Sequence, residues 1–490
     1  MSRRKSRLPG KIITALLFVI ALAFMTLLIY TKLLPATYMG IIAAALVVMI
    51  LLVYLLVRKF RHKIRFTIGA LLAIIMVAVM AAGSYYIYKT VNTLGNITNV
   101  NVEVAHVGVY VLQDDTAQNF GETAGYTFGI LSNLDRENTD ETVEQLNVQL
   151  ATYIQTKEYA GLLEIADGIR NGEVGAIILN QAYLDLITEI DGYTDFESQI
   201  REITSTKVET VIERTTPAAT NTTTESQDAG KVITLYISGI DTRGAMTAKS
   251  RNDVNIIATI NTKTKQVLLL STPRDYYVPL SISGGVPDKL THAGIYGIDV
   301  SIDTLELLYD IQIDYYFRVN FAGFINIIDA LGGVNVYSDY SFTSSHIGTY
   351  FSEGYNYMTG EQALAFARER YAFSEGDRQR GKNQMHVIEA VIQKALSTEL
   401  LTNYTSVLEG VEGSFETNVP YDVIASLVRQ QLSEGGSWNI VSYSTDGTGS
   451  TQKPYSMSSN AYVMIPDQTT VDKAKELMRQ VRDGEIISLE

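Results

Sequence analysis

Three long apolar stretches near the start of the chain constrain its folding more than any other feature. They run over Ile12 to Thr31, Ala36 to Val57 and Phe66 to Tyr88. A helix of about twenty apolar residues spans the roughly 30 Å hydrocarbon core of a bilayer, so each stretch is long enough to cross it. A cleaved signal peptide has a shorter apolar core and is not followed by two further spans. The sequence therefore predicts three transmembrane helices, rather than a buried helical hairpin of a soluble protein.

Basic residues beside these stretches predict their orientation. Five Lys or Arg precede the first stretch and five lie between the second and third, whereas the turn between the first two holds only Lys32. Basic residues of short loops tend to stay on the cytoplasmic side of a membrane. We therefore expect residues 1–11 to be cytoplasmic and everything after about Lys89 to be extracellular.

The charge of the chain is divided between these two parts. The first ninety residues hold twelve Lys or Arg and no Asp or Glu, whereas the remaining four hundred hold 27 basic and 53 acidic residues, a net charge of −26. This acidity argues against a general nucleic-acid partner, because affinity for phosphate backbones comes from Lys and Arg. The sequence has no cysteine, which excludes a disulfide scaffold, a thiolate zinc site and a cysteine nucleophile.

A smaller accessory α/β domain is predicted over residues 96–214. Alternating apolar residues in Val102 to Leu112 predict a strand, and helical periodicity follows in Glu141 to Tyr153. Glu164 to Leu186 reads as a helix, a turn at Asn171-Gly172, a strand and a second helix, without a chemical constellation. The Thr-rich segment 215–230 has no large apolar residue and predicts a flexible linker.

A second mixed α/β domain is predicted from Lys231 to the end, over residues 231–490. Three strand-like runs, rich in Ile, Val, Leu and Thr, open it at Val232 to Ser238, Val254 to Ile260 and Gln266 to Ser271. Helical patterns follow at Ser301 to Leu308, Phe321 to Leu331, Glu361 to Ala367 and Gln379 to Leu396.

Charged residues stand at three ends of these opening strands. The short connection between the second and third strands favours an antiparallel meander, in which the end of the first strand, the start of the second and the end of the third share one sheet edge. The alternative is that charged residues simply mark turns. The residues at this edge are Asp241, Arg251, Asp253, Arg274 and Asp275.

A second group of arginines lies in the segment from Met358 to Gln384. Thr359 and Gln362 form a capping box for a short amphipathic helix. Arg368 and Arg370 face one ligand together only if this helix ends near Arg368. Asp377 is a candidate N-cap of the next helix, on which Arg380 and Gln384 share a face. The alternative is a solvated helix face with surface ion pairs.

The chemistry of these side chains favours a phosphate ligand. The guanidinium fork matches paired phosphate oxygens, so several arginines from separate segments indicate a polyanion such as a pyrophosphate. Two nearby aspartates indicate a hard cation, because Mg²⁺ usually binds one or two carboxylates together with water and substrate phosphate oxygens.

Six motifs follow one another in order along the second domain. They are SGIDTR (238–243), SRNDVNIIATIN (250–261), LLLSTPRDYYVPL (268–280), LGGVNV (331–336), GEQALAFARER (360–370) and EGDRQRGKNQ (375–384). These motifs resemble those of the LytR-CpsA-Psr family, and the three spans with an intervening domain resemble in particular its streptococcal capsule-type members. The distal motif departs from the family's pattern, because Gly381, Lys382 and Asn383 follow Arg380 where many relatives have a further arginine before the glutamine.

The resemblance implies a phosphotransferase that moves a glycopolymer from a polyprenyl-pyrophosphate carrier in the lipid bilayer to peptidoglycan, through a phosphodiester. It also implies an α-β-α catalytic domain with a mostly antiparallel sheet and an apolar tunnel for the lipid, with capsule-synthesis proteins as further partners. By this resemblance Asp241 and Asp253 hold Mg²⁺ or Mn²⁺, and Asp377 orients an arginine or helps to deprotonate the acceptor hydroxyl. The pyrophosphate clamp comprises Arg251, Arg274, Arg368, Arg370 and Arg380, with a hydrogen bond from Gln384.

Other functions remain open on the sequence alone. An extracellular pyrophosphatase would use the same residues with water as the nucleophile, and a membrane-bound regulator would sense the polymer or its lipid. A Ser/His/Asp hydrolase would have to use His292, His346 or His386, but the domain has no G-x-S-x-G elbow.

Overall fold

The computed structural model describes residues 8–58, 63–98, 102–212, 231–240, 249–397, 407, 410–411, 413–457 and 459–489. The predicted linker 215–230 and Asp241 lie outside these described residues. The chain divides into two units. The first comprises Met1–Asn99, Leu396–Glu412 and Val419–Ser437, and the second comprises Val100–Ala395, Gly413–Asn418 and Trp438–Glu490.

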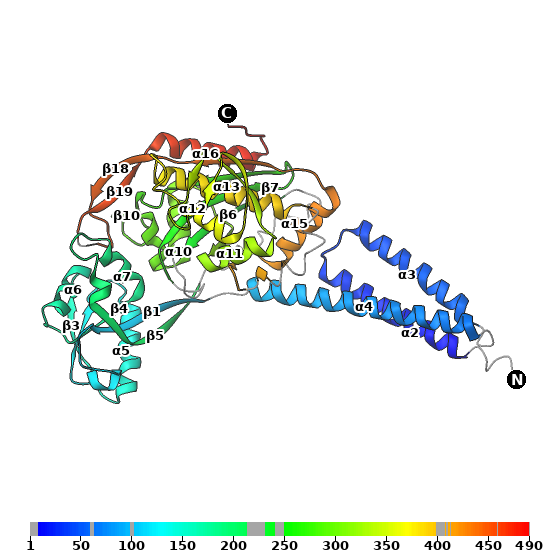
Figure 1. The fold of residues 1–490 in the computed structure, drawn as a ribbon, viewed down its shortest axis with the longest axis horizontal. Coiled ribbons are helices and arrows are strands. Elements are labelled where there is room, and N and C mark those ends of the chain that lie inside the picture. Colours follow the sequence, from blue (N-terminus) through cyan, green and yellow to red (C-terminus); the bar gives the residue numbers. More distant parts are fainter. Residues whose placement is uncertain are drawn as a thin grey trace. The chain divides into compact units, whose positions relative to one another are not determined.

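The first unit contains three apolar helices, each long enough to span a membrane, which confirms the prediction of three such helices (Figure 1). They pack against one another through small residues: a Cβ at Gly10 would lie 2.2 Å from the backbone oxygen of Val57. The helix α15 (Tyr421–Glu434) belongs to the same unit. The three apolar helices are α2 (Leu8–Thr31), α3 (Ala36–Val57) and α4 (Lys63–Thr98).

The second unit begins with a five-stranded sheet over residues 102–211, which we call the N-terminal module. The strand order is β3-β2-β4-β1-β5, with β1 antiparallel to β4 and β5, and β2 parallel to β3 and β4. The helix α5 packs on one sheet face, whereas α6 and α7 pack on the other. The elements are β1 (Val102–Leu112), β2 (Thr127–Leu131), α5 (Arg136–Leu150), β3 (Gln155–Tyr159), α6 (Leu162–Arg170), β4 (Ala176–Asn180), α7 (Gln181–Thr188), α8 (Phe196–Gln199) and β5 (Ile200–Val211).

A six-stranded sheet forms the centre of the remaining mixed α/β region, in the order β16-β11-β6-β7-β8-β17. The strands β6, β7 and β8 form the predicted antiparallel meander, and three of the five strand pairings in this sheet are antiparallel. The strands are β6 (Val232–Ile240), β7 (Asn252–Asn261), β8 (Gln266–Ser271), β11 (Tyr315–Val319), β16 (Glu416–Thr417) and β17 (Asn439–Ser444).

Helices cover both faces of this sheet, which explains why its central strands are nearly continuous apolar runs. Ile257 and Leu268 point into a core formed with α10 and α16, whereas Ile256 and Leu269 point into a second core with Met385 of α13. The result is an α-β-α arrangement (Figure 1). The helices of this region are α9 (Ala293–Tyr296), α10 (Ile298–Tyr309), α11 (Phe321–Ala330), α12 (Gly360–Arg368), α13 (Asp377–Ala395) and α16 (Gln468–Asp483).

Short strand pairs decorate the sheet region. The pair that matters below is β12 (Val334–Ser338) with β15 (Gly354–Met358), because its register sets an exposed face. The others are β9 (Tyr277–Pro279) with β10 (Pro287–Lys289), β13 (Phe342–Thr343) with β14 (Tyr350–Phe351), and β18 (Gly447–Gln452) with β19 (Ala461–Pro466).

The local structure around the second arginine group was predicted correctly except at one residue. The capping box of Thr359 and Gln362 is present, and α12 ends at Arg368, as the two-arginine argument requires. Asp377, however, lies in the first turn of α13 and does not precede the helix as an N-cap. A carboxylate in the first turn still stabilises the helix dipole, and here it also forms an ion pair with Arg380.

Candidate functional site

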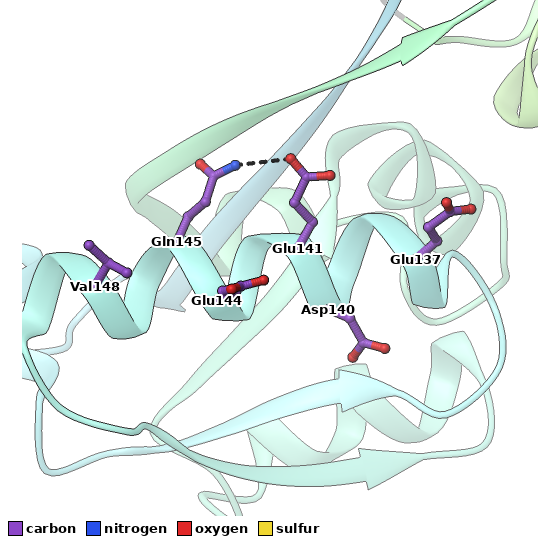
Figure 2. A pocket seen from close by; sticks show the side chains of 6 residues that line it. All are labelled: Glu137, Asp140, Glu141, Glu144, Gln145 and Val148. Atoms are coloured by element: carbon purple, nitrogen blue, oxygen red, sulfur yellow. Dashed lines mark hydrogen bonds between the residues drawn. The ribbon is translucent and has the colours of Figure 1, made fainter.

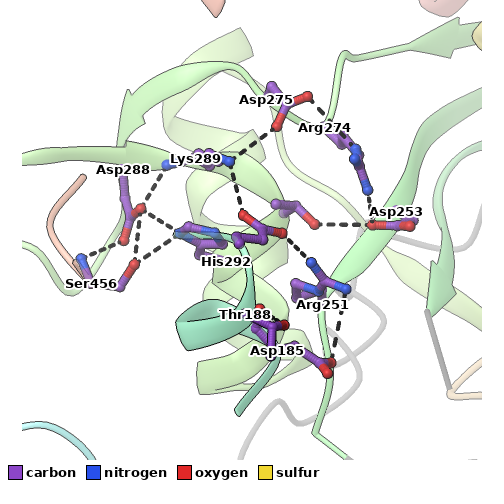
Figure 3. Close-up of polar contacts among 12 residues, drawn as sticks. Asp185, Thr188, Arg251, Asp253, Arg274, Asp275, Asp288, Lys289, His292 and Ser456 are labelled. Atoms are coloured by element: carbon purple, nitrogen blue, oxygen red, sulfur yellow. Dashed lines mark hydrogen bonds and ion pairs between the residues drawn. The ribbon is translucent and has the colours of Figure 1, made fainter. Parts of the chain in front are cut away.

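The meander brings three of the predicted residues to one edge of the six-stranded sheet. Arg251 directly precedes β7, Asp253 is the second residue of that strand, and Arg274 follows the end of β8. Arg274 Nη1 donates a hydrogen bond of 2.9 Å to Asp253 Oδ1, and Thr291 Oγ1 lies 3.4 Å from the same oxygen (Figure 3).

The start of α13 adds a third arginine, Arg380, to this edge. Arg380 Nη2 donates to Asp377 Oδ2 at 2.7 Å, and the same carboxylate oxygen lies 3.8 Å from Arg274 Nε. The side chains of Arg274 and Arg380 are only 18% and 13% exposed, so the charges are largely removed from water. We call Asp253, Arg274, Asp275, Asp377 and Arg380 the arginine–aspartate cluster.

Within this cluster, Arg380 is the group whose electrostatics favour an additional anion. Burial disfavours the charged form of Asp253, but Arg274, Arg251 and Arg380 outweigh it, so its pKa lies below the ordinary value. Burial lowers the pKa of the Arg380 guanidinium, Arg274 and Arg370 add to this shift, and Asp377 and Asp253 oppose it without cancelling it. An anionic ligand beside Arg380 would favour the charged form of this guanidinium.

Arg251 is held by the N-terminal module. Its guanidinium forms an ion pair with Glu189, the residue that follows α7, and lies 3.8 Å from Asp185 Oδ2 (Figure 3). Lys289 Nζ connects this contact to the cluster, because it lies 3.1 Å from Glu189 Oε2 and 3.7 Å from Asp275 Oδ1. The sequence of residues 96–214 shows no chemical constellation, but two of their carboxylates contact a predicted clamp arginine in the structure.

Arg368 and Arg370 lie on either side of the end of α12, each against an aromatic ring. The Arg368 guanidinium is 4.3 Å from the centroid of Phe321, and that of Arg370 is 4.7 Å from the centroid of Tyr371. Arg370 contributes to the pKa shift of Arg380, which places the two charges within electrostatic range. Within the part of the chain that the structure describes, the Arg368 guanidinium contacts Phe321 and not the cluster.

The remaining polar residues of α13 divide between the site and the surface. Gln384 is half-buried one helical turn beyond Arg380. Arg378 forms an ion pair of 2.8 Å with Asp446, and Lys382 forms one of 3.1 Å with Glu375, and all four side chains are well exposed. Arg378 and Lys382 are therefore surface residues in this structure.

Glu369, between the two arginines, anchors their segment and was not predicted. This buried carboxylate accepts hydrogen bonds from the backbone nitrogens of Ser345, Tyr371 and Ala372. Burial would raise its pKa, but the bonds from the backbone and hydroxyl of Ser345 and from Ala372 and Tyr371 hold it below the ordinary value. The sequence shows that Glu369 lies between two candidate arginines. It does not show which hydrogen-bond donors surround the Glu369 carboxylate.

We expect Glu369→Gln to lower the free energy of unfolding by about 1–3 kcal/mol at pH 7, because a neutral amide accepts more weakly and places its own N–H groups near three donors. The folded-state pKa of Glu369 is depressed, so this contribution is full above the unfolded value of about 4.3 and is lost as the pH falls through the folded value. Urea titrations at pH 7 and pH 3 measure the difference. Glu353→Gln, an exposed control, should change stability by less than about 0.5 kcal/mol; an equal loss in both variants would contradict the anchoring role.

The three histidines do not form a hydrolase site. His292 Nδ1 lies 2.7 Å from Asp288 Oδ1 and 2.8 Å from Ser456 Oγ, so the acid and the hydroxyl contact the same ring nitrogen. A catalytic relay requires them on opposite nitrogens. His346 and His386 lie near the backbone oxygen of Arg368 and near Asp339, respectively.

An acidic hollow lies on the exposed side of α5, away from these residues (Figure 2). Its carboxylates would repel phosphate, so the arginine–aspartate cluster is the better anion site. Among the described residues, no group of three or more His, Cys, Asp or Glu side chains is arranged to hold a metal ion. The hollow is lined by Glu137, Asp140, Glu141, Glu144, Gln145 and Val148.

Comparisons with known proteins connect this chain to one family. The sequence model of the LytR_cpsA_psr family matches residues 197–480, more than half of the chain. The polyisoprenyl-teichoic acid–peptidoglycan teichoic acid transferase TagU of Bacillus cereus is 37% identical over 199 residues, covering 40% of this chain but only 64% of that protein. The TagU of Halalkalibacterium halodurans is 33% identical over 238 residues, covering 48% of this chain and 75% of that protein. The crystal structure of B. subtilis TagV is 29% identical, with a TM-score of 0.45, and covers 52% of this chain and 98% of that chain.

Proposed function

The chain belongs to the LytR_cpsA_psr family, and from this premise we propose that it is a membrane-anchored phosphotransferase that moves a glycopolymer from a polyprenyl-pyrophosphate carrier to peptidoglycan. The observation that carries the proposal is the arginine–aspartate cluster, where the largely buried side chains of Arg274 and Arg380 meet at the carboxylate of Asp377. The transferase names of the relatives support the same reaction class.

Pyrophosphate binding in this proposal uses Arg274 and Arg380 at the centre, with Arg368, Arg370 and Gln384 toward the ends of the ligand. Arg251 joins the clamp when its ion pair with Glu189 opens. The N-terminal module thereby acts as an accessory domain that controls how many arginines the ligand meets. A ligand must compete with Glu189 for Arg251, which makes this contact a point where sensing and catalysis can be coupled.

Mg²⁺ is the cation that fits this site, with Mn²⁺ as a substitute. Asp253 fits as a ligand because its pKa is lowered and its carboxylate is ionised at neutral pH, and Asp241 completes the pair in our proposal. A site with so few protein ligands is typical of Mg²⁺, which takes its other ligands from water and substrate phosphate. When bound, the ion would neutralise charge on the pyrophosphate oxygens.

The transfer itself is an in-line displacement at the phosphorus nearer the glycan. A sugar hydroxyl of the acceptor forms the new P–O bond, the bond to the bridging oxygen breaks, and polyprenyl phosphate leaves with the bonding electrons. Asp377 holds Arg274 and Arg380 in place and accepts the hydroxyl proton. Such chemistry depends mainly on alignment and charge neutralisation, which is what a rigid set of arginines supplies.

The membrane anchor serves this reaction by keeping the site near a lipid-linked substrate. We propose that the amino terminus is cytoplasmic and that both α/β regions are extracellular. In the first unit Tyr421 Oη of α15 donates to the backbone oxygen of Thr31, and Arg429 donates to that of Lys32, both at 2.9 Å. These contacts put α15 at the turn predicted to face outward, which supports the orientation. The half-buried apolar helix α11 is suited to contact the lipid.

A reconstituted transfer tests the proposal. The full chain in nanodiscs receives a defined lipid-pyrophosphate glycopolymer and peptidoglycan glycan strands, and mass spectrometry identifies products. We expect a phosphodiester-linked glycan, its loss after chelation with EDTA and its recovery with Mg²⁺. Hydrolysis of the donor without a linked product would instead identify a pyrophosphatase. If neither hydrolysis nor transfer is detected, a non-catalytic regulator is the remaining function. Comparing teichoic-acid and capsular donors identifies the polymer and so whether capsule-synthesis proteins are partners.

A further inference from the structure

Exposed tyrosines gather on one face of the β12–β15 pair and beside it. In this antiparallel pair Tyr337 lies opposite Tyr355, and Tyr357 is two residues further on the same face. The rings of Tyr337 and Tyr355 are 5.3 Å apart in an edge-to-face arrangement, while their side chains remain 41% and 68% exposed. We call Tyr337, Tyr340, Tyr355, Tyr357 and Tyr371 the tyrosine strip; each is at least 41% exposed.

This strip reaches Arg370, one of the arginines predicted for the pyrophosphate clamp. Tyr371 directly follows Arg370, whose Nη2 donates a hydrogen bond of 2.6 Å to its hydroxyl. Tyr340 lies with its ring centroid 6.2 Å from that of Phe373, in the loop that leads to Asp377. A ligand lying along the strip would therefore end beside Arg370.

The composition around the strip restricts the ligand's chemistry. The segment from Gly332 to Thr359 contains no Lys or Arg, and its charged residues are Asp339 and Glu353. This acidic segment, which carries four of the five tyrosines, would be repelled by an anionic membrane surface, since peripheral membrane segments combine aromatic residues with basic ones. Tyrosine presents an apolar ring face and a hydroxyl, which suits the C–H faces and hydroxyl groups of a sugar. A large exposed aromatic patch is also unusual unless it has a partner.

We propose that the tyrosine strip binds the glycan strand of peptidoglycan, a polymer of β-1,4-linked N-acetylated amino sugars, and presents its hydroxyl to the cluster. This inference rests on the proposed function, for which it supplies the acceptor subsite. The donor is held by its pyrophosphate and by the bilayer. The sugar backbone of the acceptor offers no pyrophosphate to the arginines, so its affinity has to come from contacts of the kind that the strip provides.

Calorimetric titration of chitohexaose, a soluble N-acetylglucosamine oligomer, into the full chain in nanodiscs tests the strip without any transfer step. We expect the double variant Tyr337→Ala/Tyr355→Ala to bind about tenfold more weakly, because two stacking faces are lost. Tyr337→Phe/Tyr355→Phe should bind within about twofold of the wild type, because stacking needs the ring rather than the hydroxyl. Tyr153→Ala, an exposed control in the N-terminal module, should bind like the wild type.

In the transfer reaction the double Ala variant should raise KM for the glycan acceptor while leaving KM for the lipid donor unchanged. Unchanged chitohexaose binding in that variant would overturn the proposal. So would an equal loss of binding to maltohexaose, or a loss of liposome binding while chitohexaose binding is unchanged. Chitohexaose binding is independent of donor chemistry. If the wild type transfers polymer but the double Ala variant still binds chitohexaose normally, this inference alone is overturned. If the wild type shows no transfer but chitohexaose binding depends on the strip, the proposed function alone is overturned.

Discussion

Replacing Arg380 by alanine should lower the rate of polymer transfer by about 10² to 10³-fold. Its guanidinium is 13% exposed, pairs with Asp377 and lies within electrostatic range of Arg274 and Arg370. The loss of one preorganised donor at a reacting oxyanion has an effect of this size. The measurement is the initial rate of phosphodiester formation in the reconstituted reaction at saturating donor.

The neighbouring Arg378 provides a matched control on the same helix. Its side chain is 51% exposed and pairs with Asp446 at the surface, so Arg378→Ala should retain transfer within about threefold. Both variants remove one positive charge from α13, which separates a specific contact from a general change in charge. Equal losses of rate in the two variants would contradict the assignment of Arg380 to the site.

The second large effect concerns Arg318, whose replacement by methionine should lower the free energy of unfolding by about 3–5 kcal/mol. Arg318 is 2% exposed and joins Glu103 of β1 to Glu416 of β16, with Nε 2.9 Å from Glu416 Oε2. Glu103 also accepts from the backbone nitrogen of Ile298 at the start of α10. Without the arginine, two buried carboxylates lose their shared positively charged partner. Removing one partner of a buried ion pair has a cost of this order.

Urea titration followed by the fluorescence of Trp438, the only tryptophan in the sequence, measures this effect in the detergent-solubilised chain. Arg479→Met is the control, because Arg479 pairs with Glu476 and Asp483 on the surface of α16 at 55% exposure. That variant should lose less than about 1 kcal/mol. If Arg318→Met were as stable as Arg479→Met, the contacts of Arg318 with Glu103 and Glu416 would not stabilise the packing of the N-terminal module on the central sheet.

Local sequence patterns predicted the elements that position the site. The bounds of β1, β8 and α3 were predicted as they occur, because β1 shows apolar alternation and β8 and α3 are apolar runs. The meander followed from one short connection, and it brings Asp253 and Arg274 together. Asp377 was placed one position wrongly, because side chains of this type are common both before a helix and in its first turn.

Long-range contacts could not be predicted in the same way. Arg251 was assigned to the clamp, and nothing in its own segment indicates that Glu189, 62 residues earlier, forms an ion pair with it. Arg318 lies 215 residues from Glu103 and 98 from Glu416, and a lone arginine in a strand of aromatic residues carries no sign of two buried partners. Such pairs depend on how the N-terminal module packs against the sheet, and the spacing of apolar residues along the sequence does not indicate that packing.

The most direct test of the pyrophosphate site is equilibrium binding of a short-chain polyprenyl pyrophosphate in the presence of Mg²⁺, measured by calorimetry on the full chain. The wild type and Arg378→Ala should bind alike, whereas Arg380→Ala should bind at least about tenfold more weakly, since a charge-assisted bond to phosphate is lost. Polyprenyl monophosphate should bind more weakly than the pyrophosphate to the wild type. Equal affinity of the wild type and Arg380→Ala for the pyrophosphate would show that the ligand binds elsewhere.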